Sequence, residues 1–317
     1  MKSWIALVLF AAAGLAQAQQ RVLLDTDRGP ILVELDAAKA PNTVANFLRY
    51  VDDKRYDNIL LYRILKDFII QGGGYKEDTS PVARFPNIAS ERNNGLLNTP
   101  GTIAMALANQ ANGQPDTGSA NVDFFFNMNT NTVLDPNFTV FGKVVYGMGT
   151  LALINPITVN FNQNNQPIRP PLIKRTVRVA AGSFPILAQH AGGWYDPAKP
   201  GKGFSIEVAN GSDAAGNPVL VAYWYDYFEG KQVWMGGAAS FAWGASSVEV
   251  PLQITQGGVF GPNFDPATVT SNPNWGKLTV KFTACDRASF SYTSLYGNGS
   301  YELRRLTLPS GTRCDAN

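Results

Sequence analysis

Short apolar runs separated by turn residues fill the first half of the chain and predict a mostly β structure. RVLLDTDRGPILVELD (residues 21–36) is two such runs divided by Asp-Arg-Gly-Pro, which predicts a β-hairpin. The next segment, residues 40–53, instead has helical periodicity, and Asn42 or Thr43 can cap the start of that helix. Its apolar face consists of Val44, Phe47, Leu48 and Val51. Further short β-rich runs, bounded by Gly, Pro or Asn, continue to about residue 181.

The second half alternates apolar and polar residues with a period of two and shows no helical periodicity. Segments such as GFSIEV, VLVAYWYDYF, SSVEVPLQI and KLTVKFTA are strand candidates, and five of the six tryptophans lie in this half. The pattern predicts a separate all-β domain, either a barrel or a sandwich. An Asn-, Gln- and Pro-rich run at residues 157–171 predicts a loop.

These patterns divide the chain into four parts. We expect a signal peptide at residues 1–18, a first domain at 21–182, a linker at 183–191 and an all-β tail domain at 192–309. The linker contains the only histidine, His190, which we expect to be solvated.

The first 18 residues have the features of a cleavable export signal. Lys2 precedes a short apolar core at residues 5–15, and Ala16-Gln17-Ala18 forms a small-x-small cleavage site. The core is too short to span a bilayer, and no later apolar run is long enough. We therefore expect an exported protein, periplasmic or secreted, without membrane insertion.

Charge and cysteine content narrow the possible functions. Lys and Arg number 26 against 24 Asp and Glu, and no basic run occurs, so the sequence predicts no nucleic-acid partner. In an exported chain the two cysteines, Cys285 and Cys314, are predicted to form a disulfide, the alternative being two free buried thiols. Two cysteines and one distant histidine do not fill a zinc site, so we expect neither a metal nor another cofactor.

A single histidine also excludes a hydrolase that uses a Ser-His-Asp or Cys-His arrangement, whereas isomerisation of an X-Pro bond needs no such group. The barrier to rotation about the X-Pro bond, about 18–20 kcal/mol, comes from amide resonance. Twisting the bond leaves a lone pair on the proline nitrogen, which a fixed hydrogen-bond donor can stabilise. One strong donor and an apolar slot for the proline ring therefore suffice. LYRILKDFIIQGGGY (residues 61–75) places Arg63 and Gln71 inside apolar runs.

This stretch resembles the signature of the cyclophilins, in which an arginine precedes Phe-x-x-Gln-Gly-Gly. The resemblance continues, in order, through NNGLLNTPGTIAMALA, SANVDFFFNM and VLDPNFTVFGKVVYGM, and covers about residues 21–181. It implies a peptidyl-prolyl cis-trans isomerase on a closed eight-stranded β-barrel capped by two helices. The fold class is therefore mainly β throughout the chain, and the implied partners are proline-containing polypeptides.

The resemblance also implies roles for individual residues. Arg63 matches the catalytic arginine, and Gln71 matches the glutamine that orients it. Walls of the proline pocket are matched by Phe68, Met105, Phe125 and Leu134. The strand that hydrogen-bonds the substrate backbone is matched by Ala106 and Leu107, where main-chain groups make the contact. Phe138 stands at a substrate-binding position where eukaryotic members have histidine.

Four features depart from the family pattern. Asp123 stands where a second glutamine is common, and Val133 stands where many eukaryotic members have tryptophan. Phe138 is the third departure. The fourth is the loop at residues 109–118, which is lengthened and which we expect to border the groove. These departures leave the catalytic core intact but put substrate preference and drug sensitivity in doubt.

Other interpretations stay open at this point. Arg63 can be a structural charge that pairs with Asp57 or Glu91. The chain can bind proline segments without turnover, or its aromatic-rich tail can carry the main function by binding a cell-surface glycan or protein. The tail also resembles a module of secreted bacterial proteins whose role is unknown, and its ligand is not evident from the sequence.

Overall fold

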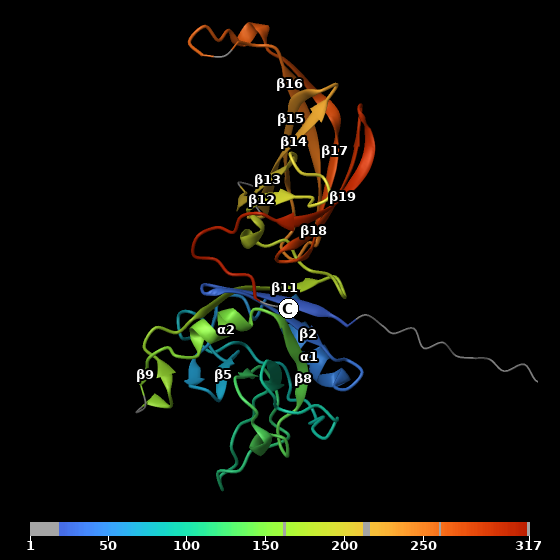
Figure 1. Cartoon of the computed structure of the whole chain (residues 1–317). Helices are drawn as coiled ribbons and strands as arrows, with labels where there is room; N and C mark the ends of the chain where they lie inside the picture. The colour runs from blue at the N-terminus through green and yellow to red at the C-terminus, as the bar shows by residue number, and fades with distance from the viewer. Residues whose placement is uncertain (1–18, 161–162, 212–215, 260, 316–317) are drawn as a thin grey trace, which may run out of the picture.

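The structure, a computed structural model, describes residues 19–315 apart from 161–162, 212–215 and 260. The expected signal peptide lies outside the described residues. Within them, α-helix is confined to α1 (Pro41–Asp52) and α2 (Met148–Ile154), so the mainly β prediction is confirmed. The strands form two bodies that lie one above the other in Figure 1. No helix in the described part of the chain has the length and apolarity needed to cross a membrane.

The first body is a curled nine-stranded sheet with the order β3-β11-β1-β2-β8-β6-β7-β5-β4. Its strands are β1 (Arg21–Thr26), β2 (Gly29–Leu35), β3 (Ile59–Leu60), β4 (Arg63–Leu65), β5 (Ile69–Gly72), β6 (Thr102–Met105), β7 (Phe124–Asn127), β8 (Val140–Tyr146) and β11 (Leu172–Val179). The expected hairpin is β1–β2, paired in antiparallel register. The two edge strands, β3 and β4, are consecutive in the chain, so the sheet curls back on itself as a half-barrel.

Helix α1 packs on the first body through its apolar face. All four residues of the predicted face lie in the core of the first body. The expected cap is wrong, since the helix begins at Pro41 and neither Asn42 nor Thr43 caps it. Instead, Glu91 accepts hydrogen bonds from the backbone N–H groups of Asn42 and Thr43, at 3.0 and 2.8 Å. A carboxylate suits the positive end of the helix dipole.

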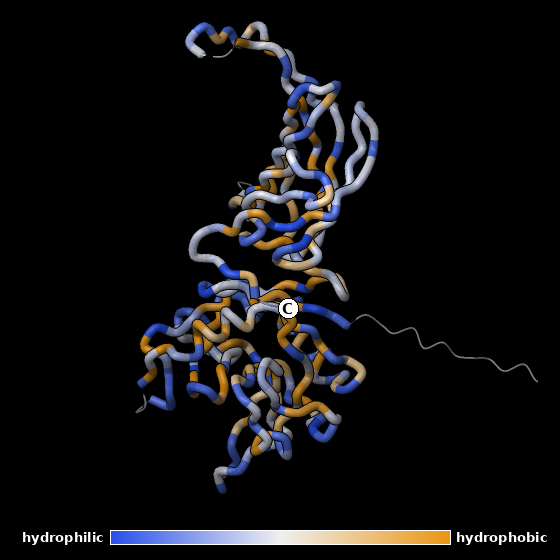
Figure 2. The backbone as a smooth tube through the Cα atoms, viewed as in Figure 1, coloured by the Kyte–Doolittle hydropathy of each residue, from blue (hydrophilic) through white to orange (hydrophobic). Residues whose placement is uncertain are grey.

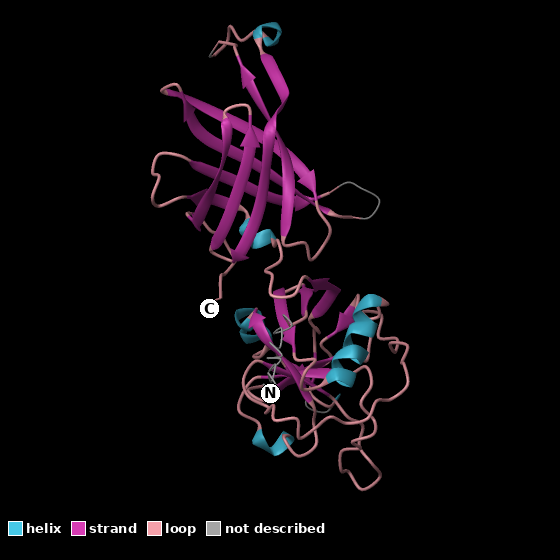
Figure 3. Cartoon of the chain, turned by 90° about the vertical axis from the view of Figure 1, so that its right-hand side faces the viewer, coloured by secondary structure: helices cyan, strands magenta, loops and turns pink. Residues whose placement is uncertain are grey.

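The second body is a closed barrel of eight strands, β12 to β19, each paired with its neighbours in the sequence. Its strands are β12 (Gly192–Tyr195), β13 (Gly203–Asn210), β14 (Pro218–Phe228), β15 (Lys231–Ser240), β16 (Ser247–Gln256), β17 (Thr270–Ala284), β18 (Arg287–Ser294) and β19 (Gly297–Arg305). Along β16, buried Val248, Val250 and Leu252 alternate with exposed residues, as the period of two predicts. Figure 3 shows the barrel strands crossing one another obliquely above the sheet and α1.

The segment between the two bodies is buried rather than solvated. Phe184, Ile186 and Leu187 join one hydrophobic cluster that contains residues of both the sheet and the barrel, and Figure 2 shows hydrophobic residues where the bodies meet. The expectation that His190 is solvated is wrong, because its exposed fraction is 0%. Its ring stacks on Phe282 with 3.7 Å between the ring centres. Burial lowers the pKa of His190 well below its usual value, so the folded protein holds the ring neutral.

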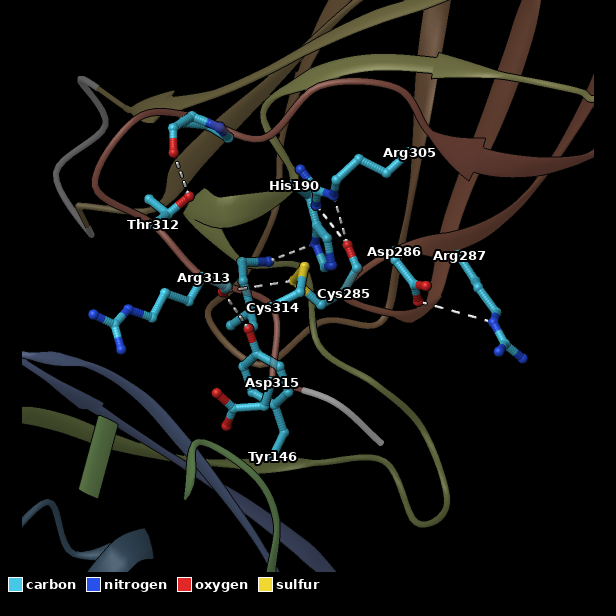
Figure 4. Close-up of a disulfide and its surroundings, with 12 residues drawn as sticks. Tyr146, His190, Cys285, Asp286, Arg287, Arg305, Thr312, Arg313, Cys314 and Asp315 are labelled. Carbon is cyan, nitrogen blue, oxygen red and sulfur yellow. Dashed lines mark hydrogen bonds and ion pairs between the residues drawn. A yellow bond between two sulfur atoms is a disulfide. The ribbon is translucent and has the colours of Figure 1, made fainter. Parts of the chain in front are cut away.

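The chain after β19 returns to the first body as a strap (residues 306–315). The predicted disulfide is present: Cys314 in the strap is bonded to Cys285, which follows β17 (Figure 4). Next to it, the hydroxyl of Tyr146 donates to the carbonyl of Arg313 at 3.1 Å. The carboxylate of Asp315 accepts from the N–H groups of Gly147 and Gly149, at 2.6 and 3.1 Å, at the start of α2. The strap therefore anchors the barrel to the first body.

A short hairpin and three 3₁₀ helices complete the description of these residues. The hairpin of β9 (Val159–Asn160) and β10 (Gln166–Pro167) lies in the segment expected to be a loop. Short 3₁₀ helices are η1 (Thr132–Leu134), η3 (Ala188–His190) and η4 (Pro266–Thr268).

Candidate active site

Strand register brings the two signature polar residues side by side. Arg63 on β4 lies opposite Gln71 on β5, and Gln71 lies opposite Phe125 on β7. Residues that are direct partners across neighbouring strands point to the same face of a sheet. Arg63, Gln71 and Phe125 therefore form one row across three strands.

An apolar patch continues this row. We use that term for Phe68, Phe125, Leu134 and Phe138, which belong to one cluster separate from the inner core. Phe125 and Phe138 meet edge to face, with 5.6 Å between ring centres. The side-chain amide of Asn131 donates to the carbonyl of Phe68 at 2.9 Å, which ties β5 to the segment that carries Leu134. Three members of the patch are partly exposed, so the patch offers an apolar surface beside Arg63.

One expected wall residue is elsewhere. The side chain of Met105 has an exposed fraction of 0% and lies in the inner core, so its placement in the proline pocket is wrong. Alternation along β6 explains this, because Ala104 and Ala106 face the patch while Met105 faces the opposite way. Ile69, which the sequence reasoning missed, belongs to the patch cluster instead. Leu107 follows the end of β6, and its half-buried side chain packs on the inner core.

The guanidinium of Arg63 is held at two points. Its Nη1 donates to Gln71 Oε1 at 3.3 Å, and its Nε donates to Asn164 Oδ1 at 3.2 Å. Burial lowers the pKa of Arg63, but an arginine stays charged under all ordinary conditions. Neither predicted structural partner takes part: Asp57 accepts from the N–H of Thr176, and Glu91 caps α1. Arg63 is thus a half-buried cation with neutral partners.

Gln71 also forms a hydrogen bond on the side away from Arg63, with residues that sequence reasoning did not place in the site. Its Nε2 donates to the hydroxyl of Tyr62 at 2.6 Å, and that hydroxyl donates to Asp123 Oδ1 at 2.9 Å. Arg84 donates to the other carboxylate oxygen of Asp123 at 3.1 Å. The sequence marked Asp123 only as a departure from the family pattern.

Open space adjoins the residues that hold Arg63. A cavity of about 340 Å³ is lined by Tyr62, Tyr75 and Asn164, among others. The loop expected to lie near the site, residues 109–118, folds onto itself through a bridge between Asn109 and Pro115. The half-buried cation therefore lies beside the apolar patch, and its partner Asn164 borders the cavity.

The comparison with known proteins decides the family. The model of the cyclophilin-type peptidyl-prolyl cis-trans isomerases matches residues 21–178. The isomerase cyp18 of Streptomyces antibioticus is 36% identical over 163 residues, which cover 48% of this chain and 95% of the relative. The chain belongs to the cyclophilin-type peptidyl-prolyl cis-trans isomerases. The cyclophilin match ends before the barrel, whose family stays open.

Other cyclophilins give the same picture. Peptidyl-prolyl cis-trans isomerase A of Dickeya dadantii is 36% identical over 177 residues, covering 54% of this chain and 90% of the relative. A crystal structure of a Cryptosporidium parvum cyclophilin aligns with a TM-score of 0.42 and 24% identity, over 51% of this chain and 98% of that one. The family model and the sequence relatives make the first body a cyclophilin domain and the protein a peptidyl-prolyl cis-trans isomerase. The substrates of cyclophilins are proline-containing peptides.

Proposed function

We propose that this cyclophilin accelerates X-Pro isomerisation in exported proteins as they fold, with Arg63 as the catalytic donor. The observation that carries the proposal is the two-point fixation of Arg63 beside the apolar patch. In the twisted state the proline nitrogen gains a lone pair, to which a fixed guanidinium can donate. Because that lone pair is absent from the planar amide, the hydrogen bond favours the transition state over the ground state.

The apolar patch supplies the second part of the reaction. The proline ring packs against Phe68, Phe125 and Leu134, while Phe138 supports Phe125 edge to face. Removing water from the bond strengthens the interaction with Arg63 and disfavours the charge-separated planar amide. Main-chain groups of Ala106 and Leu107 hold the peptide in an extended conformation. No nucleophile, metal or cofactor enters this mechanism.

The assay is the rate of cis-trans exchange in a short Ala-Pro peptide, measured by NMR exchange spectroscopy. The intact protein is expected to accelerate exchange by orders of magnitude, whereas a protein that binds the peptide without faster exchange supports the non-catalytic alternative. Arg63→Ala separates the two, since a mere binding role for the patch survives that change.

Export is the second element of the proposal, and it rests on the apolar core and cleavage site at the start of the chain. Removal of residues 1–18 leaves Gln19 at the N-terminus. A disulfide between Cys285 and Cys314 suits an oxidising compartment. Mass spectrometry of the protein from the extracytoplasmic fraction is expected to find Gln19 first, and an intact Met1 there contradicts export.

A second candidate function rests on the outer face of the barrel. Tyr225 on β14 and Trp234 on β15 are direct cross-strand partners, with exposed fractions of 50% and 49%. Tyr227, two residues further along β14 on the same face, is 51% exposed. Exposed aromatic side chains that share one face are typical of binding surfaces.

The occupant that this face fits best is a cell-surface glycan, because sugar rings stack on aromatic side chains. Pull-down of the full chain by peptidoglycan, compared with Trp234→Ala, tests the idea. Tyr75→Ala, which changes an aromatic of the cyclophilin domain, is the matched control. Equal retention of all three proteins excludes this face as the glycan site.

A further inference from the structure

Asp123 is an unusual group to find behind a cyclophilin site. It immediately precedes β7, and its side chain is 15% exposed. Its two oxygens are used by Tyr62 and Arg84. Gly74 leaves room for it, because a Cβ there meets the Asp123 carboxylate. The third glycine of the QGGG run is thus explained by Asp123.

The chain of hydrogen bonds from Asp123 has a fixed direction. An ionised carboxylate can only accept hydrogen bonds, so the Tyr62 hydroxyl must donate to it. The oxygen of Tyr62 is then available as an acceptor, and Gln71 must present its Nε2 to it. Only one orientation of the Gln71 amide remains, with Oε1 facing the guanidinium of Arg63. Burial, with a smaller contribution from Asp123, raises the pKa of Tyr62, which keeps the hydroxyl protonated as a donor.

Without a carboxylate at position 123, nothing fixes which of Tyr62 and Gln71 donates in the hydrogen bond between them. The Tyr62 hydroxyl is then free to donate to Gln71 Oε1, which turns the amide over. The Nε2 group of Gln71 then faces Arg63, where two donors oppose each other. Arg63 loses one of its two fixed partners, although Asn164 still holds its Nε.

We propose that Asp123 is a positioning residue for isomerisation: through Tyr62 it fixes the amide orientation of Gln71 and so aims Arg63. This inference rests on the proposed role of Arg63 as the catalytic donor. The chemistry also predicts a pH dependence, since a protonated carboxyl can donate and no longer dictates the direction of the chain.

The groups around Asp123 predict that the activity changes with pH below neutrality. Arg84 and Tyr62 contact its carboxylate, while Tyr50 and Tyr56 are the other titratable groups nearby. The raised pKa values of the three tyrosines keep them neutral below neutral pH, so Asp123 is the group that changes charge there. Burial raises the pKa of Asp123 above its usual value, with Tyr62 and Arg84 opposing the shift. As pH falls toward that raised pKa, activity is expected to decline.

A double-mutant cycle tests the proposal with the full chain and an Ala-Pro peptide. Asp123→Ala is expected to lower kcat/KM about 5- to 20-fold, mainly through kcat. In a Gln71→Ala background the same change is expected to cost less than about twofold, because the orientation it controls is gone. Equal losses in both backgrounds overturn the proposal. Asp52→Ala, which removes a carboxylate at the end of α1 that pairs with Arg178 on β11, is the matched control.

Asp123→Asn keeps the shape of the side chain but cannot titrate, and its amide, like a protonated carboxyl, offers one acceptor and one donor where Tyr62 and Arg84 both need an acceptor. It is expected to lower kcat/KM at neutral pH about as much as Asp123→Ala does and to lose the acid-side decline. A decline that persists in a folded Asp123→Asn protein overturns the proposal, and this measurement decides even where Asp123→Ala does not fold. If Arg63→Ala abolishes turnover while the Asp123 and Gln71 changes simply add, the proposed function stands and this inference fails.

Discussion

Replacing Arg63 by alanine tests the proposed mechanism most directly. Uncatalysed X-Pro exchange takes about 100 s, and an enzymic rate of about 10³ s⁻¹ requires a barrier lower by about 7 kcal/mol. A hydrogen bond from a charged donor contributes about 1.5–3 kcal/mol, and more where water is excluded. Arg63 is half-buried and fixed at Nε and Nη1, so we place its contribution at about 3–4 kcal/mol. The remainder must come from desolvation and orientation on the apolar patch.

Arg63→Ala is therefore expected to lower kcat/KM about 10²- to 10³-fold while the fold persists. Arg63→Lys is also expected to be poor, because an ammonium cannot match the planar fork that Gln71 and Asn164 hold. The measurement is NMR exchange on an Ala-Pro peptide, with circular dichroism as the fold control. Arg28→Ala, which removes a more exposed arginine paired with Asp27, is the matched control. A folded Arg63→Ala protein with a nearly full rate refutes the catalytic role of Arg63.

Three further predictions concern the rest of the chain. Replacing Cys285 and Cys314 by serine is expected to lower the free energy of unfolding by about 3–4 kcal/mol, because the unfolded chain loses a cross-link between residues 29 apart. Urea denaturation measures this loss, and an unchanged midpoint contradicts the prediction. His190 is neutral in the folded protein and takes up a proton only on unfolding, so the free energy of unfolding is highest above about pH 6.5 and falls by up to about 1.4 kcal/mol for each pH unit below it. His190→Gln is expected to flatten this dependence, which urea denaturation at pH 5 and pH 7 measures. Cyclosporin is expected to inhibit weakly, because Val133 is 72% exposed and offers no donor; nanomolar inhibition in the exchange assay contradicts this.

The sequence predicted the parts of the site that belong to continuous strands. Arg63 and Gln71 are eight residues apart in a hairpin, so their pairing follows from local register. Met105 was misplaced because a motif match names positions without saying which face of β6 each side chain takes. A strict alternation count starting from Ala106 assigns Met105 to the core and favours the patch only for Ala104 and Ala106.

Contacts between distant segments were beyond the sequence reasoning. Asn164 meets Arg63 across 101 residues, from a run that composition marked only as a loop. Tyr62 reads as an ordinary aromatic of a buried strand until Asp123 comes beside it. His190 was misjudged for the same reason, since its ring is buried by stacking on Phe282, which β17 brings to it. In each case the contact joins chain segments that folding brings together, and no local pattern encodes it.

The strap changes how the barrel and the cyclophilin domain act together. The barrel closes by pairing β12 with β19, so the chain enters and leaves it through adjacent strands. The connection before β12 is packed in a core, and the strap after β19 is anchored at Asp315. The two bodies are thus joined by two segments of the chain, which restrict the movement of the barrel relative to the cyclophilin domain. For a protein bound to the barrel, the effective concentration of its proline segments at Arg63 is then set by geometry: it is high for segments that reach the site and near zero for those that do not.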